Sequence, residues 1–301
     1  MEQRNPFYVW GEKVENLVGF KDELKFIGPF LSNIENENFG LLLINGSPGS
    51  GKSLFLERLW IDAQSRGFNV IFSRFYSNSD TFDLSSIVSA KKPLLVVIDD
   101  FDLSKNADKL LREISLYAHA GVGFAFSSLN SFSAPNSKSF TLEPLSSVEA
   151  HDLVSKSLKP TSIKMGEECI TTLLEESSGN PKIFKLLCWF LFEKLKPSEK
   201  IIIKGHYLAY SQAILSFLSR EFFGKLLATV SKKESLILRC FASSDILSVN
   251  EISNSSKVPL REVTSMILRL QKKGFLIKVE RGKYKIFARL FAKYVFSNSK
   301  I

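Results

Sequence analysis

The chain has 301 residues, of which 45% are hydrophobic, and a formal net charge of +9 at pH 7. This length suits two or three domains rather than one small domain, and the apolar content is sufficient for a buried core. The three cysteines and three histidines are scattered, so the composition excludes a disulfide framework and a zinc site and favours a reducing cytoplasm.

Residues 1–6 lack the apolar core of a signal peptide. The most apolar stretch, residues 186–192, lies between Lys185 and Glu193 and is far shorter than the roughly eighteen residues of a membrane span. We therefore expect a soluble, cytoplasmic protein without a membrane span.

The segment of residues 5–33 places Leu24, Ile27 and Leu31 on one helical face. Gly28 and Pro29 interrupt this pattern, and we expect them to break or kink the helix. On its residues alone, the segment is a helix that covers one edge of a sheet.

The most specific motif is Gly-Ser-Pro-Gly-Ser-Gly-Lys-Ser at residues 46–53, which fits the G-x-x-x-x-G-K-[ST] phosphate loop at every fixed position. An apolar run at 39–44 predicts a buried strand before the loop, and helical spacing over 54–64 predicts a helix after it. Glycines let consecutive N–H groups turn toward a phosphate, and the helix N-terminus adds its positive dipole end. We predict that Lys52 reaches the β- and γ-phosphates of ATP or ADP and that the Ser53 hydroxyl takes a Mg2+ position. The predicted nucleotide-binding residues are Gly46, Ser47, Pro48, Gly49, Ser50, Gly51, Lys52, Ser53 and Leu54.

A second nucleotide motif follows two further strands. Residues 69–76 alternate in part and predict one strand, and the uninterrupted apolar run 93–98 predicts a buried strand that ends in Asp99, Asp100 and Asp102. Carboxylates at this end of a strand beside a phosphate loop suit the Mg2+ and water-activating positions of phosphoryl transfer. We assign Asp99 to Mg2+ and Asp100 to water activation, whereas Asp102 fits better as a cap of the next helix.

Residues 103–120 have the apolar spacing of a helix, and residues 121–126 predict another buried strand that ends in Ser127 and Ser128. From residue 146 the composition becomes helical, and Ser146 with Glu149 forms a capping box. Helices over 170–176 and 182–195 are separated by Gly179, Asn180 and Pro181. Residues 201–230 are expected to form two more helices.

The C-terminal pattern is helix (234–243), a short segment (247–249), helix (250–255), turn, helix (259–273), and two strands (274–279 and 283–287). This order predicts a winged helix-turn-helix, with the turn at 256–259 and a proline at the first helical turn. Val263, Ile267, Leu268 and Leu270 are expected on the buried side of the third helix. The predicted DNA-binding residues are Lys257, Arg261, Arg269, Lys272, Arg281 and Lys283.

The positive charge is concentrated at this end of the chain. Residues 225–301 contain 16 Lys and Arg against 5 Asp and Glu, a balance of +11, whereas the residues before them contain 24 against 26. Such an asymmetry indicates a negatively charged partner, nucleic acid first and a membrane surface second. A solvated lysine-rich face is the simpler alternative.

Together, these motifs resemble archaeal AAA+ and STAND-type ATPases with a C-terminal winged helix, a group that includes relatives of origin-recognition proteins. The resemblance implies that Val18, in the hydrophobic-Gly stretch before the first helix, and Pro181, in the Gly-x-Pro turn of a helical lid, pack near the adenine. It also implies a polar γ-phosphate sensor at Ser127 or, in our assignment, Ser128. No arginine occupies the family's finger position, and Lys182 and Lys185 follow the lid turn where a sensor arginine is common.

The sequence therefore predicts an α/β P-loop NTPase domain with a parallel sheet (residues 1–145), a helical lid (146–228) and a winged helix (229–301). The expected function is a nucleotide switch that hydrolyses ATP and binds duplex DNA, with a homo-oligomer or protein partner as a further possibility. Two alternatives stay open. One is a STAND-like switch whose winged helix is an internal clamp or protein-binding module, and the other is a transposition or plasmid-maintenance helper.

Overall fold

The computed structural model describes residues 5–7, 19–75, 82, 85–103, 107–116, 121–129 and 136–298. The chain divides into two compact units. Val14–Glu143 form the first, here called the sheet unit, and Met1–Lys13 with Pro144–Ile301 form the second, here called the helical unit. Val18, to which an adenine contact was assigned, lies outside the described residues.

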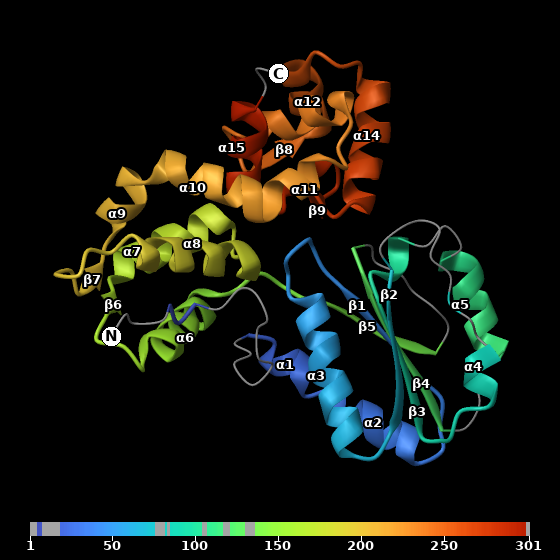
Figure 1. Ribbon diagram of the computed structural model, residues 1–301. Helices are drawn as coiled ribbons and strands as arrows, with labels where there is room; N and C mark the ends of the chain where they lie inside the picture. Colours follow the sequence, from blue (N-terminus) through green and yellow to red (C-terminus); the bar gives the residue numbers. More distant parts are fainter. Residues whose placement is uncertain are drawn as a thin grey trace. The chain divides into compact units, whose positions relative to one another are not determined.

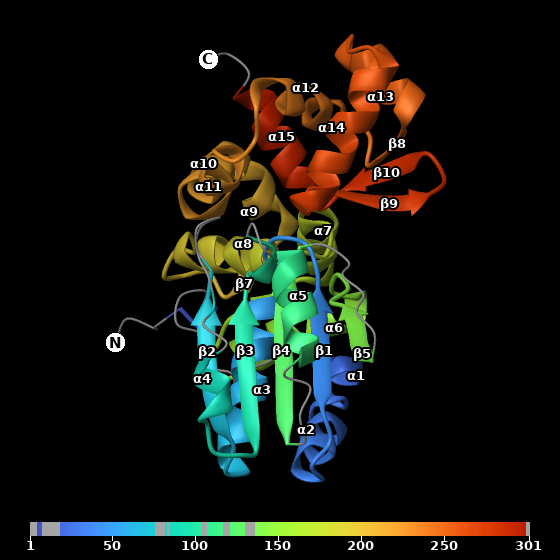
Figure 2. The same ribbon diagram turned by 90° about the vertical axis from the view of Figure 1, so that its right-hand side faces the viewer.

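The sheet unit is built on five parallel strands in the order β2-β3-β4-β1-β5 (Figure 2). Every residue of β1, β3 and β4 is buried, as continuous apolar runs require of strands that are covered on both faces. The strands are β1 (Gly40–Asn45), β2 (Asn69–Arg74), β3 (Leu94–Asp99), β4 (Val122–Ser128) and β5 (Ser137–Thr141).

Helices cover both faces of this sheet (Figure 1). On one face α2 (Ile27–Glu35) and α3 (Lys52–Ser65) pack on Leu42 and Ile44 of β1, and on the other α5 (Ala107–Leu116) lies in the cluster that contains Leu41 and Leu43. Successive strand residues point to opposite faces, so one strand contributes to both cores. The sheet unit also contains the short helices α1 (Lys21–Leu24) and α4 (Ser85–Val88) and a 3-10 turn (Phe101–Leu103).

The structure corrects two details of the sequence prediction in this unit. The N-terminal helix is interrupted at Lys25 and Phe26, not at Pro29, which lies in the first turn of α2. A proline is tolerated there because a first-turn N–H has no intrahelical partner. Leu103, the first residue of the predicted helix 103–120, belongs to the 3-10 turn, and Ala107–Leu116 form α5, while residues 104–106 and 117–120 lie outside the described residues.

The first helices of the helical unit begin with the predicted local signals. Ser146 and Glu149 form a capping box at the start of α6. The Asn180 side chain accepts a hydrogen bond from the Ile183 N–H, and Pro181 is the first residue of α8. These elements are α6 (Ser147–Leu158), β6 (Lys164–Met165), α7 (Glu167–Ser177), α8 (Pro181–Glu193) and β7 (Ile201–Ile202).

Residues 204–227 form more pieces than the two helices expected. They comprise α9 (Lys204–Ala209), α10 (Ser211–Leu218), a π-helical turn (Ser219–Phe223) and α11 (Gly224–Leu227). A Cβ on Gly224 would lie 2.7 Å from the Ser219 carbonyl oxygen, so the widened turn depends on glycine at this position.

The last part of the helical unit combines four helices with a three-stranded antiparallel sheet of order β8-β10-β9. Its elements are α12 (Lys232–Cys240), β8 (Ile246–Ser248), α13 (Val249–Ser256), α14 (Leu260–Lys272), β9 (Leu276–Glu280), β10 (Lys283–Ile286) and α15 (Arg289–Ser297). Helix α15 was not predicted, although Leu290, Phe291, Tyr294 and Val295 have helical spacing and are buried.

The prediction of the buried side of α14 was wrong at one position. Val263, Ile267 and Leu270 are buried as expected, but Leu268 is 55% exposed and Met266 takes the place in the core that was assigned to it.

Residues from the start of the chain pack in the helical unit. The Asn5 side-chain amide donates to the Trp189 carbonyl oxygen (3.0 Å) and to Glu193 (2.7 Å). The Phe7 ring is 1% exposed and lies edge-on to Phe192. The helical unit is therefore built from two separate parts of the chain, one before and one after the sheet unit.

Among the described residues, no helix has both the length and the apolarity to cross a bilayer.

Candidate nucleotide-binding site

Residues 46–53 form a tight loop between β1 and α3. The Gly46 N–H donates to the Ser128 carbonyl oxygen at the end of β4 (3.1 Å), and the Ser50 N–H donates to the Ser47 carbonyl oxygen (3.2 Å). Lys52 is 6% exposed, and its ammonium donates to the carbonyl oxygens of Gly46 (2.8 Å) and Ser47 (3.1 Å). The first two residues of the loop therefore lie next to the ammonium group of the loop's own lysine.

Gly46 is required by space, and Gly51 is required by both space and conformation. A Cβ on Gly46 would overlap the Ser50 hydroxyl oxygen. Gly51 has a φ of +100°, and its Cβ would lie 2.7 Å from the Phe20 ring. Sequence reasoning missed Phe20, which lies two residues after Val18, the predicted adenine contact.

The loop has the unsatisfied donors of an anion-binding site. Helix α3 begins after Gly51 with no side-chain cap, so the N–H groups of its first turn have no capping side chain. The Ser50 hydroxyl is buried and has no hydrogen-bond partner among the described residues. A helix N-terminus preceded by a glycine cradle binds phosphate, and these residues fit a nucleotide. Ser53 and Leu54 lie partly buried in the first turn of the same helix.

Asp99 lies at the end of β3 with its side chain fully buried. Its Oδ2 accepts from Arg74 at the end of β2, with distances of 2.8 Å from Nε and 2.7 Å from Nη2. Its Oδ1 accepts a short hydrogen bond from the Ser127 hydroxyl of β4. Arg74 was not predicted as a site residue, although a charged residue near the end of the predicted strand 69–76 was a usable signal.

Asp100 follows in a left-handed conformation (φ 56°), and its N–H donates to the Ser127 hydroxyl oxygen (2.8 Å). Ser127 therefore fixes both aspartates. Burial, reinforced by the neighbouring charge of Asp99, raises the pKa of Asp100 to about 6. Burial also raises the pKa of Asp102, which accepts from the Leu129 N–H (3.2 Å) and from the Ser128 side chain.

Lys52 and the three aspartates form one electrostatic group. Burial lowers the pKa of Lys52, and this is opposed in order by Asp100, Asp102 and Asp99. The loop lysine and the carboxylates at the end of β3 are therefore brought together as the motifs require. Ser128, our predicted sensor, is 3% exposed in the same region. Pro181 belongs to the helical unit.

Among the residues that the structure describes, no three His, Cys, Asp or Glu side chains form a metal cluster. Mg2+ does not need such a cluster, because it is usually held by one or two protein oxygens together with waters and substrate phosphates. The assignment of Ser53 and Asp99 to this ion stays a prediction.

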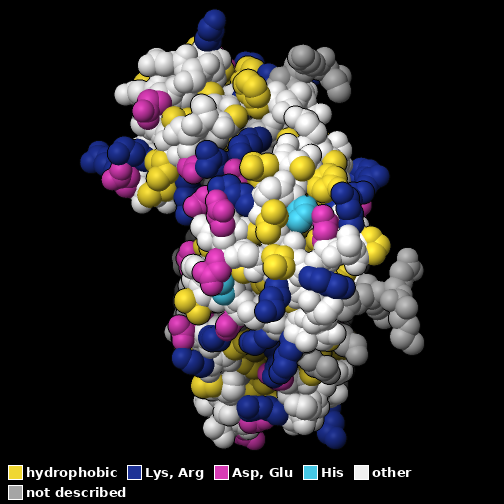
Figure 3. Space-filling model, turned by 90° about the vertical axis from the view of Figure 1, so that its left-hand side faces the viewer, with side chains coloured by type: hydrophobic (Ala, Val, Ile, Leu, Met, Phe, Trp, Pro, Cys, Tyr) yellow, Lys and Arg dark blue, Asp and Glu magenta, His cyan; other side chains and the backbone are white. Residues whose placement is uncertain are grey.

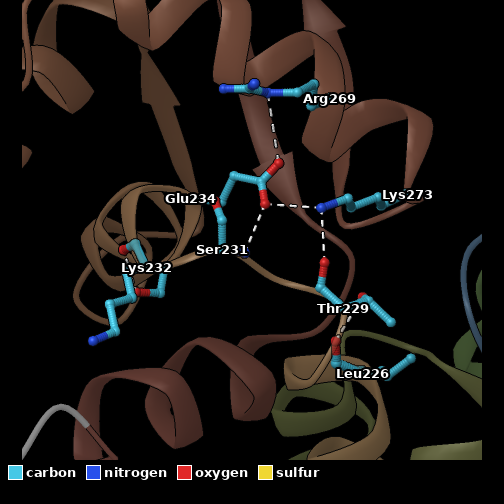
Figure 4. A network of polar contacts seen from close by, with 8 residues as sticks. Leu226, Thr229, Ser231, Lys232, Glu234, Arg269 and Lys273 are labelled. Atoms are coloured by element: carbon cyan, nitrogen blue, oxygen red, sulfur yellow. Dashed lines mark hydrogen bonds and ion pairs between the residues drawn. The ribbon is translucent and has the colours of Figure 1, made fainter.

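The basic residues predicted to bind DNA lie on and around α14 and the β9–β10 hairpin, and all six are exposed. Two of them have acidic partners. The Arg269 Nε lies 3.7 Å from Glu234, which also accepts from Lys273, as Figure 4 shows. Lys283 pairs with Glu280 at 2.8 Å. Figure 3 shows the side on which α9 and α10 lie in Figure 1, not the side labelled α14, and there Lys and Arg side chains are interspersed with acidic ones.

The five-stranded parallel sheet, with a glycine-rich loop after β1 and paired aspartates at the end of β3, is a fold shared with solved structures of ATPases and of a DNA-bound protein. The Walker-type ATPase paby2304 of Pyrococcus abyssi is similar, with a TM-score of 0.69 and 14% identity over 96% of this chain and 99% of that one. The ORC1 protein of Aeropyrum pernix in complex with DNA gives 0.54 and 15% identity over 98% and 97%. The RuvB Holliday junction branch migration motor of Thermotoga maritima gives 0.52 and 15% over 92% and 95%. No protein-family model and no curated protein sequence matches the chain.

Proposed function

We propose that this protein is a Mg-ATP-binding P-loop ATPase that works as a nucleotide-dependent switch. The observation that carries the proposal is the placement of the buried Lys52 ammonium among the loop carbonyl oxygens and the charges of Asp99, Asp100 and Asp102. A lysine and paired carboxylates in this relation are the parts that phosphoryl transfer needs to hold phosphate, metal and water.

Each group of the site has one task in this proposal. The N–H groups of residues 46–54 and the Lys52 ammonium hold the phosphates, while Ser53 and Asp99 hold Mg2+. The bound ion would supply charge neutralisation at the phosphate oxygens. Asp100 accepts a hydrogen bond from the attacking water, and Ser128 is the polar contact at the end of β4. An aspartate is shorter than the glutamate usual at this position, so we expect slow hydrolysis.

We further propose that residues 229–301 are a winged helix that binds duplex DNA. Helices α12, α13 and α14 followed by the β9–β10 hairpin have the expected order, and residues 225–301 have the +11 balance of a DNA-binding region. Two proteins of similar fold, the ORC1 protein in complex with DNA and the RuvB branch migration motor, support this choice of partner.

A second candidate is a STAND-like switch in which the C-terminal domain acts as an internal clamp or protein-binding module. The packing of α15 on α7 favours it. Lys293 pairs with Glu176 at 2.6 Å, and the Arg289 N–H donates to the Ser178 hydroxyl oxygen (2.9 Å). The two candidates share the nucleotide site and differ in whether duplex DNA is bound.

The test of the nucleotide site is Mg-ATP binding measured by calorimetry. We expect Lys52→Ala to abolish or greatly weaken binding, because the phosphates lose their main charge-assisted donor. Lys109→Ala is the matched control, since it removes an exposed lysine of the same unit and should bind as the parent does. Equal affinity of parent and Lys52→Ala would remove the phosphate-loop assignment.

A further inference from the structure

The outward face of α14 combines basic residues with two exposed leucines. Leu260 is 49% exposed and Leu268 is 55% exposed, and Thr264 lies between them. Residues four apart lie one above the other on a helix, so these three side chains form a stripe. Leu260 and Leu268 are separated by eight residues, which at 1.5 Å per residue is about 12 Å of helix. The stripe is thus comparable in length to three or four base-pair steps.

The hydroxyl groups on this face are already engaged as donors. The Thr264 hydroxyl donates to the Leu260 carbonyl oxygen (3.1 Å), and the Ser265 hydroxyl donates to the Glu262 carbonyl oxygen (2.8 Å). The Thr264 side chain therefore has a methyl group and a hydroxyl oxygen that can accept a hydrogen bond left for contact with a partner. The centre of the face therefore offers apolar contact rather than hydrogen-bond donors.

The charges around the stripe are suited to a polyanion. Arg261 and Lys272 are exposed on the same helix, near its two ends. The only carboxylate of α14, on Glu262, is paired with Lys233 at 2.9 Å, and Arg269 faces Glu234. Cations that flank an apolar centre favour DNA over an apolar protein surface as the occupant, since phosphates lie on both sides of a groove.

The side chains of this face can be compared with the pattern of base edges in the major groove. Adenine is read by Asn or Gln, cytosine by Asp or Glu, guanine by Arg or Lys, and the thymine methyl group by apolar contact. Gln271 and Glu262 are only partly exposed, so the exposed positions of α14 have no amide or carboxylate. They have Arg261 for guanine and the Leu260–Thr264–Leu268 stripe for methyl groups.

We propose that α14 reads thymine through its C5-methyl groups, with Leu260 and Leu268 as the specificity-determining residues. This inference rests on the proposed DNA-binding function and names the chemistry of its base contact. Such a helix discriminates between T-containing and T-free steps by the methyl group rather than by hydrogen bonds to bases. Arg261 then supplies the polar contact, and the hairpin residues supply contacts to the backbone.

The test uses duplexes of alternating dA and dT and the same duplexes with dU in place of dT, which lack only the methyl group. Binding to the full chain is measured by fluorescence anisotropy at fixed salt. We expect binding to the dU duplex to be weaker by about fourfold for each buried methyl group, as expected for roughly 0.8 kcal/mol per methyl. Leu260→Ala with Leu268→Ala should abolish this difference. The control, Ile201→Ala with Leu208→Ala, removes exposed apolar residues elsewhere in the unit and should retain it.

The outcomes separate the inference from the function on which it rests. A parent protein that shows no salt-dependent duplex binding would contradict the proposed DNA-binding function. A parent that binds both duplexes equally, or a leucine variant that still distinguishes them, would contradict only the reading of methyl groups. A leucine variant with unchanged DNA binding that loses association with another copy or with a protein partner would assign the stripe to protein docking and overturn the proposal.

Discussion

Asp99 is a buried carboxylate whose charge is balanced by groups from two neighbouring strands. The Arg74 fork contacts one oxygen, and the Ser127 hydroxyl contacts the other. The contact to Arg74 follows from the parallel register, which places Arg74 directly opposite Asp99. The local sequence could predict each strand but not their adjacency, so this partner was missed.

Removal of Arg74 should destabilise the nucleotide-free protein. We expect Arg74→Met to cost about 1–3 kcal/mol, less than the loss of a partner in a fully buried pair, because Arg74 is 39% exposed. Urea unfolding of parent and variant measures the difference. The control, Arg58→Met, removes a similarly exposed arginine whose partner Asp62 is 29% exposed, unlike the fully buried Asp99, and it should cost less than about 1 kcal/mol. Equal costs in the two variants would mean that the contact of Arg74 with the buried Asp99 adds no stability beyond that of a partly exposed ion pair.

Asp100→Asn should separate nucleotide binding from turnover. The amide has nearly the same volume and its carbonyl oxygen can still accept a hydrogen bond, but it has no charge with which to polarise a water. We expect Mg-ATP affinity close to that of the parent and phosphate release at least tenfold slower, in line with the contribution of a general base. A variant with the turnover of the parent would show that another group activates the water.

The raised pKa of Asp100 also predicts a dependence of stability on pH. Because burial and the neighbouring Asp99 raise the pKa in the folded protein to about 6, the folded state binds this proton more tightly than the unfolded chain. Ionisation of Asp100 therefore destabilises the fold as the pH rises from about 4 through 6. The side-chain amide of Asp100→Asn does not ionise in this range. Urea unfolding between pH 4.5 and 7.5 should show the variant gaining stability relative to the parent as the pH rises, and a constant difference would contradict the shift.

Local sequence signals predicted well those elements whose boundaries depend on a cap or on a continuous apolar run. The capping box at Ser146 and the Asn180–Pro181 start of α8 depend on residues within one turn, and β1, β3 and β4 are buried throughout. Elements whose structure depends on distant packing were less predictable. Leu268 has an apolar side chain, but only the tertiary arrangement decides that Met266 faces the core instead.

The same dependence on tertiary contacts applies to the interactions of α14. Glu234 belongs to the capping box of α12, with Ser231, yet it also accepts from Lys273 and lies near Arg269 at the end of α14 (Figure 4). Lys273 donates further to the Thr229 carbonyl oxygen (2.8 Å). This network fixes one end of α14, so Arg269 has a structural role beside any contact with DNA.

Arg261 in α14 and Arg281 in the turn between β9 and β10 do not belong to this network, so they are the better test of DNA binding. Arg261→Ala with Arg281→Ala should weaken duplex binding by roughly 1–3 kcal/mol for each residue and lower the salt slope by about one or two. Mg-ATP binding should be unchanged, because neither residue lies in the sheet unit. Lys156→Ala with Lys159→Ala makes the same change of charge at the end of α6 and is the control. Parent-like binding by the arginine variant would favour the STAND-like alternative.

At the scale of the whole molecule, the helical unit includes residues from both ends of the sequence. Phe7 is buried against Phe192 of α8, so Phe7→Ala should destabilise this unit by about 3 kcal/mol. Urea unfolding followed by tryptophan fluorescence measures the change, since Trp189 lies on α8. Phe296→Ala, at a residue that is 61% exposed, is the control and should cost at most about 0.5 kcal/mol. Similar losses in both variants would argue against a specific role for Phe7.

The contact of Asn5 with Trp189 joins residues 184 positions apart. During synthesis, residues 14–143 leave the ribosome well before α8 exists, so the nucleotide-binding sheet can fold while the start of the chain still lacks its partner. Contacts of such long sequence range form late and slowly. The nascent chain therefore has an interval in which Phe7 is exposed to solvent, and a chaperone that binds short apolar segments would find it there.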